Sequence, residues 1–366
     1  MWRKDEGSTG RLIQLSLGYL GFYIITGLSV KYFTSMDPGF PGMHSMEYLV
    51  YSTASSTLLA TTVVLFLKWY KMDSIKLIQL GRLKFPSEFL YIIPSGLCTA
   101  VVVPTTTLLY SFRGISVMVA MVIMRGAVII IGRIVDAIQI RRGILKKKVY
   151  WEENVAVLFA LLAVSTKVFS GSSGGKANPF TSLPVVIIFV SYICAYAIRI
   201  YIMNYYKNTR PKEYRKNSNK GFFAIEQITS TVTIYLVAVV LLIVVKTTGW
   251  SGERITPFAN AVFHPVQGLW YWAMIFGTAF GIVAFFSVFI FMFRGRTATF
   301  AGLVNRLTSL IAGTTSTLLF AVFFGGKFPQ IIDWISLMFI LIAVGFIACA
   351  EKKRIVELKI ENGKIL

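Results

Sequence analysis

Apolar runs of about 20 residues recur along the whole chain, and a run of that length crosses the hydrocarbon core of a bilayer as one helix. Because lipid offers the backbone no hydrogen-bond partners, such runs must fold as helices. The composition agrees: 55% of the 366 residues are hydrophobic and 14% are charged, against about 25% charged residues in soluble domains. The sequence predicts an all-α integral membrane protein with ten transmembrane helices, at residues 12–34, 46–67, 87–110, 115–139, 152–170, 183–206, 222–245, 267–293, 298–323 and 331–350.

The basic residues are distributed unevenly between the connecting segments. The chain has 37 Lys and Arg against 16 Asp and Glu, a formal charge of +21, which in a soluble protein would suggest a nucleic-acid partner. Here 26 of the basic residues lie in the two terminal segments and in alternate loops, and the other loops hold five. Basic loops stay in the cytosol, so we expect both termini to be cytosolic, with the lipid bilayer and no nucleic acid as partner. The membrane would be that of the Golgi or ER in a eukaryote and the inner membrane in a bacterium.

Two stretches of the chain resemble each other and suggest an internal repeat. Residues 120–132 read "AMVIMRGAVIIIG" and residues 301–313 read "AGLVNRLTSLIAG", with Ala, Arg and Gly at matching positions. "FALLAV" (159–164) matches "FILIAV" (339–344) at nearly the same offset. Five spans per half is an odd number, so the second half would be inverted, as in many secondary transporters. The predicted organisation is a cytosolic N-terminus at 1–11, a first five-helix repeat at 12–170, an inverted second repeat at 183–350 and a cytosolic tail at 351–366.

Six basic residues fall inside the predicted spans: Lys31, Arg125, Arg133, Lys167, Arg199 and Arg306. Arg125 and Arg306 come from opposite halves, and each lies roughly 15 Å deep in a core of about 30 Å. Guanidinium groups match the geometry of phosphate and carboxylate, so together they would form an anion-binding site; alternatively, each caps a helix end or pairs with an acidic residue elsewhere. Tyrosines that could stack on a bound base are Tyr196, Tyr201 and Tyr235.

The remaining polar residues of the spans have several interpretations. Arg133 and Asp136 are three residues apart, so they are expected to form a structural ion pair on one helix face. Arg199 is either a further substrate contact or a structural charge. Glu226 could couple transport to protons, contact substrate hydroxyls or act as counter-ion to an embedded arginine. Gln227 beside it could hydrogen-bond a base or a sugar.

Nothing in the sequence points to an enzyme. His44 and His264 fall in predicted external loops and have no nucleophile at a recognisable spacing. No metal-ligand spacing and no nucleotide-binding loop motif occurs. We therefore expect no catalytic residues, no metal and no cofactor.

The stretch "GLVNRLTSLIAG" (302–313) is similar to the Gly-Ala-Leu-Asn-Lys motif on the ninth helix of nucleotide-sugar transporters, especially GDP-mannose transporters. Together with the ten spans, it makes the chain resemble the drug/metabolite transporter superfamily. The resemblance implies that Gly302, Asn305 and Arg306 bind the nucleotide. In the related plastid phosphate translocators, basic residues on the fourth and ninth helices hold the phosphate, and Arg125 and Arg306 match that placement.

The resemblance has limits within the motifs. This chain has Arg in place of Lys, and "FFAIEQ" (222–227) stands where GDP-mannose transporters carry an aromatic-Asn-Asn motif. The leading expectation is an antiporter of phosphorylated organic anions, with nucleotide sugars exchanged for a nucleoside monophosphate, working as a monomer or homodimer. The alternatives are an exporter of drugs, amino acids or other small metabolites, a lipid-phosphate flippase, and a membrane receptor or scaffold that transports nothing.

Overall fold

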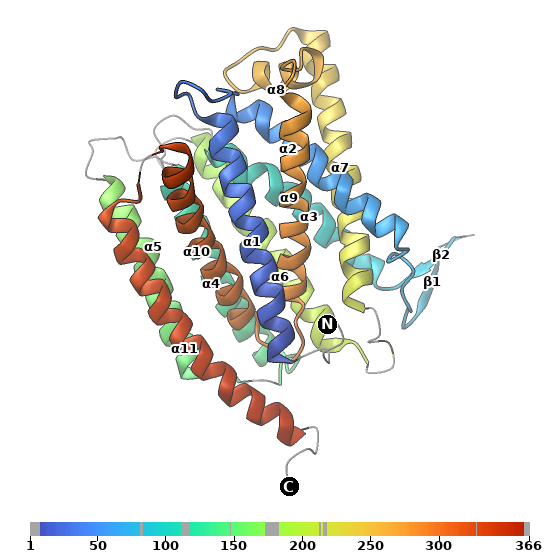
Figure 1. The fold of residues 1–366 in the computed structure, drawn as a ribbon. Helices are drawn as coiled ribbons and strands as arrows, with labels where there is room; N and C mark the ends of the chain where they lie inside the picture. The colour runs from blue at the N-terminus through green and yellow to red at the C-terminus, as the bar shows by residue number, and fades with distance from the viewer. Residues whose placement is uncertain are drawn as a thin grey trace.

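The computed structural model describes residues 8–361 apart from 81–82, 111–116, 147, 173–182, 212–213, 215–217 and 327. Within this part of the chain, ten helices of 22 residues or more form one bundle (Figure 1). These helices are α1 (Thr9–Thr34), α2 (Ser45–Phe66), α3 (Phe89–Tyr110), α4 (Val117–Arg141), α5 (Trp151–Ser172), α6 (Leu183–Thr209), α7 (Ser218–Thr248), α9 (Trp270–Phe291), α10 (Ala298–Phe324) and α11 (Ile331–Glu361).

Eight of the described helices are long and apolar enough to cross a membrane: α1, α2, α3, α6, α7, α9, α10 and α11. This confirms the predicted multi-pass, mainly helical membrane character. Pro94 and Pro104 both lie inside α3, as the third predicted span requires.

The two halves of the chain interlock. α1 packs against α9 and α10, α3 packs against α6 and α7, and α5 lies along α11. α4 contacts both α6 and α10. Each of these pairs joins a helix of the first half to a helix of the second, so one continuous apolar core holds both. Any site between the halves is therefore built from helices far apart in the sequence.

Glycines allow the close approach of α9 to α2. A methyl group placed on Gly277 would lie 2.5 Å from Cα of Ser52, and one on Gly281 would lie 2.5 Å from the carbonyl oxygen of Ser56. Neither position can therefore carry a side chain without moving a helix. Small residues at such crossings let helix backbones pack directly in membranes.

α10, which carries the Asn-Arg pair, has clear boundaries. Thr297 precedes the helix, and its hydroxyl accepts a hydrogen bond from the backbone N–H of Phe300 at 3.1 Å, as expected for an N-cap threonine. Gly325 follows the helix with φ of 69°, a left-handed conformation that glycine adopts without steric cost.

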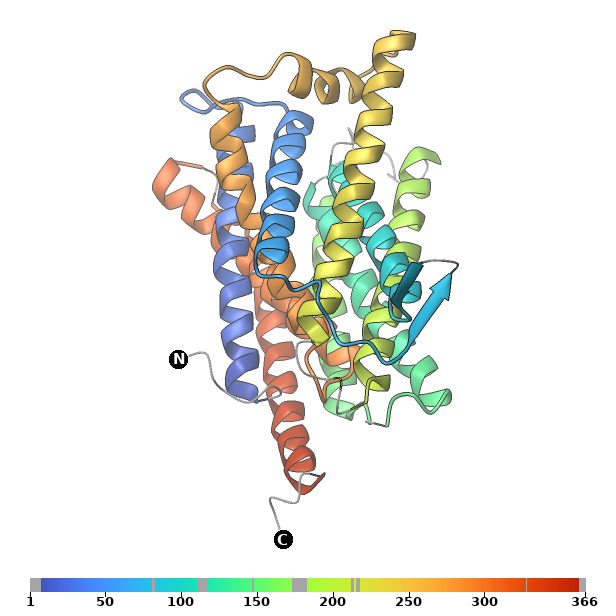
Figure 2. The same ribbon diagram turned by 90° about the vertical axis from the view of Figure 1, so that its right-hand side faces the viewer.

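Two small elements differ from the prediction of an all-α chain. Residues 68–86, predicted as a loop, contain an antiparallel hairpin of β1 (Leu77–Leu80) and β2 (Leu83–Pro86), with Ile78 opposite Phe85. The hairpin lies at the outer edge of the bundle (Figure 2). The short helix α8 (Ile255–Phe263) lies between α7 and α9. Elements of four and nine residues are too short to stand out beside apolar runs of 20.

The C-terminal segment also differs from the prediction. Residues 351–366 were expected to form a tail, but α11 continues to Glu361, and both Glu351 and Arg354 are buried. The hydroxyl of Thr9, at the start of α1, donates to Oε1 of Glu351 at 2.8 Å. The beginning of α1 thus meets the C-terminal third of α11 at one end of the bundle (Figure 1), which we call the termini end.

Candidate functional site

Arg306 lies inside the bundle on α10, and its side chain is 9% exposed. Its Nη2 donates to the hydroxyl of Tyr196 on α6, and its guanidinium lies 4.9 Å from the centre of the Tyr196 ring. Its Nε has no hydrogen-bond partner, and no carboxylate forms an ion pair with it, among the described residues. A buried charge in this state carries a large desolvation cost that the protein offsets only in part.

Arg125 occupies a similar position on α4 and is 5% exposed. Its Nη2 donates to the hydroxyl of Tyr23 on α1 at 3.1 Å, and its guanidinium lies 5.6 Å from the centre of that ring. A methyl group placed on Gly313 would lie 3.9 Å from Nη1 of Arg125. Arg125 therefore reaches α10, the helix that carries Arg306.

Each of these arginines contacts the second member of a pair of tyrosines. Tyr19 and Tyr23 lie one turn apart on α1 with ring centres separated by 5.4 Å, and Tyr192 and Tyr196 lie one turn apart on α6 with a separation of 5.2 Å. Tyr19 and Tyr192 are each within electrostatic range of both arginines. The structure thus brings Arg125 and Arg306 into one tyrosine-rich region. We call Arg125 with Tyr23, and Arg306 with Tyr196, the two arginine–tyrosine units.

The other two tyrosines considered for stacking lie elsewhere. The hydroxyl of Tyr201 accepts from Nη1 of Arg142 at 3.1 Å, near the end of α4. Tyr235 is exposed on α7, and its hydroxyl donates to the carbonyl of Ala54 at 3.0 Å. Neither contact involves the arginine–tyrosine units.

Arg199 and Glu226 form a buried bidentate ion pair between α6 and α7. Nε and Nη2 of Arg199 contact the two carboxylate oxygens of Glu226 at 2.8 and 3.0 Å. Oε1 of Glu226 also accepts from the hydroxyls of Ser95 at 2.7 Å and Thr99 at 3.2 Å, both on α3. The arginine also lies 6.0 Å from the ring of Tyr196. This geometry favours the counter-ion interpretation of Glu226 and leaves Arg199 charge-balanced.

Gln227 has a more local contact. It is buried, and its Nε2 donates to the hydroxyl of Thr231 one turn later on the same helix at 3.2 Å. This contact stays within α7, so it neither joins Gln227 to another helix nor places it with the arginine–tyrosine units.

Asn305 and Gly302 face neighbouring helices. The Nδ2 of Asn305 donates to the hydroxyl of Ser287 on α9 at 3.0 Å, and its Oδ1 accepts a long 3.5 Å hydrogen bond from Tyr19. A methyl group on Gly302 would meet the ring of Phe291 at an ordinary 3.8 Å. In this structure, Asn305 joins α10 to α1 and α9, while the adjacent Arg306 points to α6.

The expected ion pair between Arg133 and Asp136 does not form in the described part of the chain. The carboxylate of Asp136 instead accepts from the backbone N–H groups of Ala298 at 2.8 Å and Thr299 at 2.6 Å, and from the Thr299 hydroxyl at 2.5 Å. The N-terminus of a helix attracts an anion because its first N–H groups are unpaired and the helix dipole is positive there. Asp136 therefore anchors α10, and Arg133 is only half-buried.

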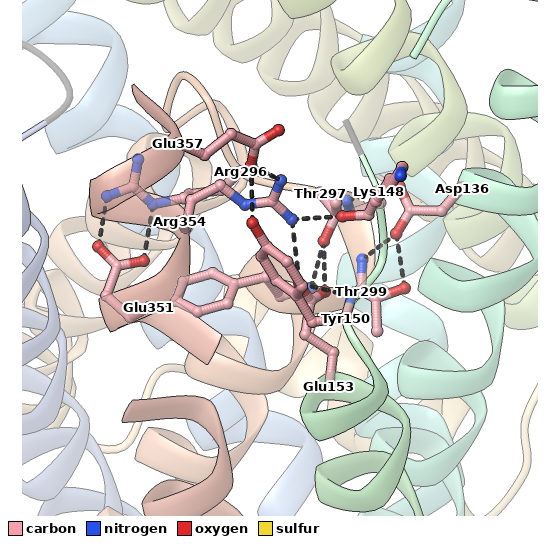
Figure 3. Close-up of polar contacts among 12 residues, drawn as sticks. Asp136, Lys148, Tyr150, Glu153, Arg296, Thr297, Thr299, Glu351, Arg354 and Glu357 are labelled. Atoms are coloured by element: carbon pink, nitrogen blue, oxygen red, sulfur yellow. Dashed lines mark hydrogen bonds and ion pairs between the residues drawn. The ribbon is translucent and has the colours of Figure 1, made fainter. Parts of the chain in front are cut away.

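A second group of buried charges lies at the termini end, and the sequence analysis missed it (Figure 3). Arg296 contacts both carboxylate oxygens of Glu351, with Nε to Oε2 at 2.8 Å. Arg354 pairs with Glu153 at 3.2 Å and with Glu357 at 2.7 Å. The sequence placed both arginines in basic segments outside the spans. We call Asp136, Glu153, Arg296, Thr297, Glu351 and Arg354 the termini-end network.

Two hydroxyls complete this region. Thr297 donates to Oε2 of Glu153 at 2.7 Å, which links the start of α10 to α5. Tyr150, just before α5, donates to Oε2 of Glu357 at 2.9 Å (Figure 3). Burial and the neighbouring carboxylate raise the pKa of Tyr150, so its phenol remains a proton donor. The network connects α1, α4, α5, α10 and α11.

Comparisons with known proteins bear on the fold alone. No family model matches the sequence, and no curated protein matches it. Among solved structures, 21 chains match. One of them, described only as "Crystal structure of protein", is similar with a TM-score of 0.51 and 14% identity, over 94% of this chain and 97% of that chain. At this identity the likeness shows a shared arrangement of helices along nearly the whole chain. No group of three metal-ligating side chains occurs in the described ranges.

Proposed function

We propose that the chain is a secondary transporter that exchanges phosphorylated organic anions, with nucleotide sugars and a nucleoside monophosphate as the leading pair. The observation that carries this proposal is Arg306, a buried arginine whose described partners are the hydroxyl and ring of a tyrosine rather than a carboxylate. An anionic ligand is the partner that would offset its desolvation. This activity involves no covalent chemistry.

The proposed architecture is ten transmembrane helices in two inverted five-helix repeats, with both termini in the cytosol. The ten long helices support it, because α4 and α5 lie within the bundle beside the eight that meet the length and hydropathy requirements. The meeting of α1 and α11 at one end agrees with an even number of crossings. Cysteine-accessibility labelling tests this orientation. Cysteines introduced at positions 211–217 should react with a reagent added on the side of the termini, and cysteines introduced at 174–181 with a reagent added on the opposite side.

Two features support exchange of an anion at this site. Arg125 and Arg306 come from different halves of the chain, so an anion held by both would be released when the halves move relative to each other. Glu226 is already paired with Arg199 and two hydroxyls. A carboxylate in that state is a poor proton carrier, so the proposal is exchange without proton coupling.

Binding to purified protein tests the proposal directly. Thermal stability would be measured against nucleotides, nucleotide sugars and sugar phosphates, and a ligand at 100 times its Kd should stabilise the protein by roughly 2.7 kcal/mol. Counterflow in reconstituted vesicles would then identify the exchanged pair. Stabilisation by amphipathic cations or neutral amino acids alone would favour an exporter of drugs or other metabolites. Stabilisation by phospholipids alone would favour a flippase.

A further inference from the structure

The two arginine–tyrosine units are built in the same way from opposite halves of the chain. In the first unit, Arg125 of α4 donates to Tyr23 of α1 at 3.1 Å. In the second, Arg306 of α10 donates to Tyr196 of α6. In both, the guanidinium also lies over the ring of the same tyrosine, at 5.6 and 4.9 Å from its centre.

The positions of these helices within the halves match as well. α1 and α6 are the first long helices of the two predicted repeats, and α4 and α10 are the fourth. In each of the two first helices, the tyrosines of the pair are four residues apart. The repeated sequence stretches around Arg125 and Arg306 contain neither Tyr23 nor Tyr196. Only the contacts in the folded structure connect these tyrosines to the arginines.

The chemistry of a unit goes beyond that of an arginine alone. A phenol that accepts a hydrogen bond from a guanidinium keeps its own O–H proton for donation. The neighbouring positive charge favours donation of that proton to an anion. Each unit can therefore offer the positive charge of its guanidinium and one phenol O–H to the same ligand. The Nε of Arg306 has no partner among the described residues, so that unit also has an N–H group available.

We propose that Tyr23 and Tyr196 are substrate-binding residues, and that the two units hold one phosphoryl group between them from opposite sides. The ligand class is a phosphate or pyrophosphate group with several acceptor oxygens, because donors approaching from two sides need acceptors on two sides. This inference rests on the proposed function and deepens it. It assigns the two halves of the chain equal roles in phosphoryl binding. It also assigns a binding role to two tyrosines that lie outside any recognised sequence motif.

Inorganic pyrophosphate is a suitable probe, since it carries the phosphoryl groups without base or sugar. Its Kd would be measured with full-length protein in detergent, from the dependence of melting temperature on pyrophosphate concentration. Tyr23→Phe and Tyr196→Phe should each weaken binding about tenfold, which corresponds to about 1.4 kcal/mol. The two factors should agree within about threefold.

The matched control is Tyr206→Phe. Tyr206 is buried on α6 like Tyr196, and its hydroxyl donates to the carbonyl of Ser218 at 3.2 Å, away from both units. This variant also loses one buried hydroxyl, so it should change the melting temperature of the empty protein while leaving the Kd for pyrophosphate unchanged. A loss of affinity in Tyr206→Phe equal to that in Tyr196→Phe would show a general destabilisation and overturn the assignment.

The remaining outcomes are distinct. Wild-type affinity in both Tyr23→Phe and Tyr196→Phe would overturn the role of the tyrosines and leave the proposed function intact. Weaker pyrophosphate binding in only one of the two variants would overturn the proposal that both units bind the same phosphoryl group. If pyrophosphate does not change the melting temperature of the wild-type protein, this inference is overturned, because it proposes that the two units bind the phosphoryl group itself. The screen of nucleotides and sugar phosphates would then decide the proposed function separately.

Discussion

The arginines at the centre of the bundle and those at the termini end are buried to a similar degree but have different partners. Arg125 and Arg306 are 5% and 9% exposed and contact tyrosine hydroxyls. Arg296 and Arg354 are both 2% exposed, and each has at least one carboxylate within hydrogen-bond distance. Arg296 and Arg306 thus differ little in burial, yet Arg296 is charge-balanced by a carboxylate, whereas Arg306 contacts a neutral phenol and has no carboxylate partner among the described residues.

This difference in partners suggests different roles for the two groups of arginines, one in the stability of the fold and the other in ligand binding. A buried arginine with its carboxylate has a fixed partner, and removing either member leaves an uncompensated charge. A buried arginine held by a neutral hydroxyl has a smaller fixed stabilisation, so a mobile anion gains more from contacting it. The termini-end network should therefore hold the fold together, whereas the arginine–tyrosine units should determine what binds.

The largest effect is expected from breaking the termini-end network. Glu351→Ala should destabilise the protein by about 3–5 kcal/mol, because Arg296 would remain buried without its partner. Thermal or denaturant unfolding in detergent measures this. The control is Lys352→Ala on the same helix, whose exposed side chain forms no ion pair in the described part of the chain, so this change should cost about 0.5 kcal/mol or less. Equal losses in the two variants would contradict the special role of the network.

Removing the central charge should instead affect binding. Arg306→Ala should weaken binding of a phosphorylated ligand by roughly 1.5–3 kcal/mol, about ten- to over a hundredfold. Arg306→Lys should restore part of this, because the charge remains and only the fork geometry is lost. The empty variant should melt at or above the wild-type temperature. An Arg306→Ala protein that melts far lower, yet keeps the full ligand-induced shift, would show that the arginine is structural.

A double variant sharpens this second prediction. Removal of both Arg125 and Arg306 should cost less binding free energy than the sum of the single variants, because the two would share one ligand. The measurement is a double-mutant cycle on ligand affinity. Strict additivity would indicate that the two arginines act on separate ligands or separate steps.

Asp136 and Arg133 provide a comparison within a single helix. Asp136→Ala should cost about 1–2 kcal/mol of stability, because it leaves the first N–H groups of α10 without their acceptor. Arg133→Ala should change stability by no more than about 0.5 kcal/mol, because the half-buried Arg133 has no buried partner in the part of the chain that the structure describes. Equal losses measured by thermal unfolding would restore the ion pair that the sequence predicted.

The smallest expected effect is on the pH dependence of stability at Glu88, whose carboxylate pairs with Arg210 just before α3. Burial alone would raise the pKa of Glu88, but hydrogen bonds from the Ile75 N–H and the Ser74 hydroxyl, with the charge of Arg210, hold it below its ordinary value. A lowered folded-state pKa stabilises the protein above the unfolded pKa, and this contribution is lost as the pH falls through the folded value. Melting temperature should therefore fall less steeply on acidification in Glu88→Gln than in wild type. Identical acid profiles would contradict this assignment.

Much of this protein could be predicted from local patterns. The long apolar runs became α-helices, because a helix satisfies its own backbone hydrogen bonds within the segment and apolar length is a local property. The burial of Arg125, Arg199, Glu226 and Arg306 followed from their positions inside those runs. The sequence by itself thus determined the long helices, the membrane character and the burial of these four charges, but not the burial of the termini-end network.

The tertiary structure decided which groups those charges meet. Asp136 has a nearby arginine in sequence, yet it binds the start of α10, more than 160 residues away. Glu226 meets Arg199 and Arg306 meets Tyr196 across separate helices, and Arg296, just before α10, meets Glu351 of α11. These choices depend on how helices rotate and pack against one another, which is fixed by contacts distributed over the whole bundle. Hydropathy can place a charge in the interior, but only packing selects its partner, and the partner decides whether that charge stabilises the fold or remains available for a ligand.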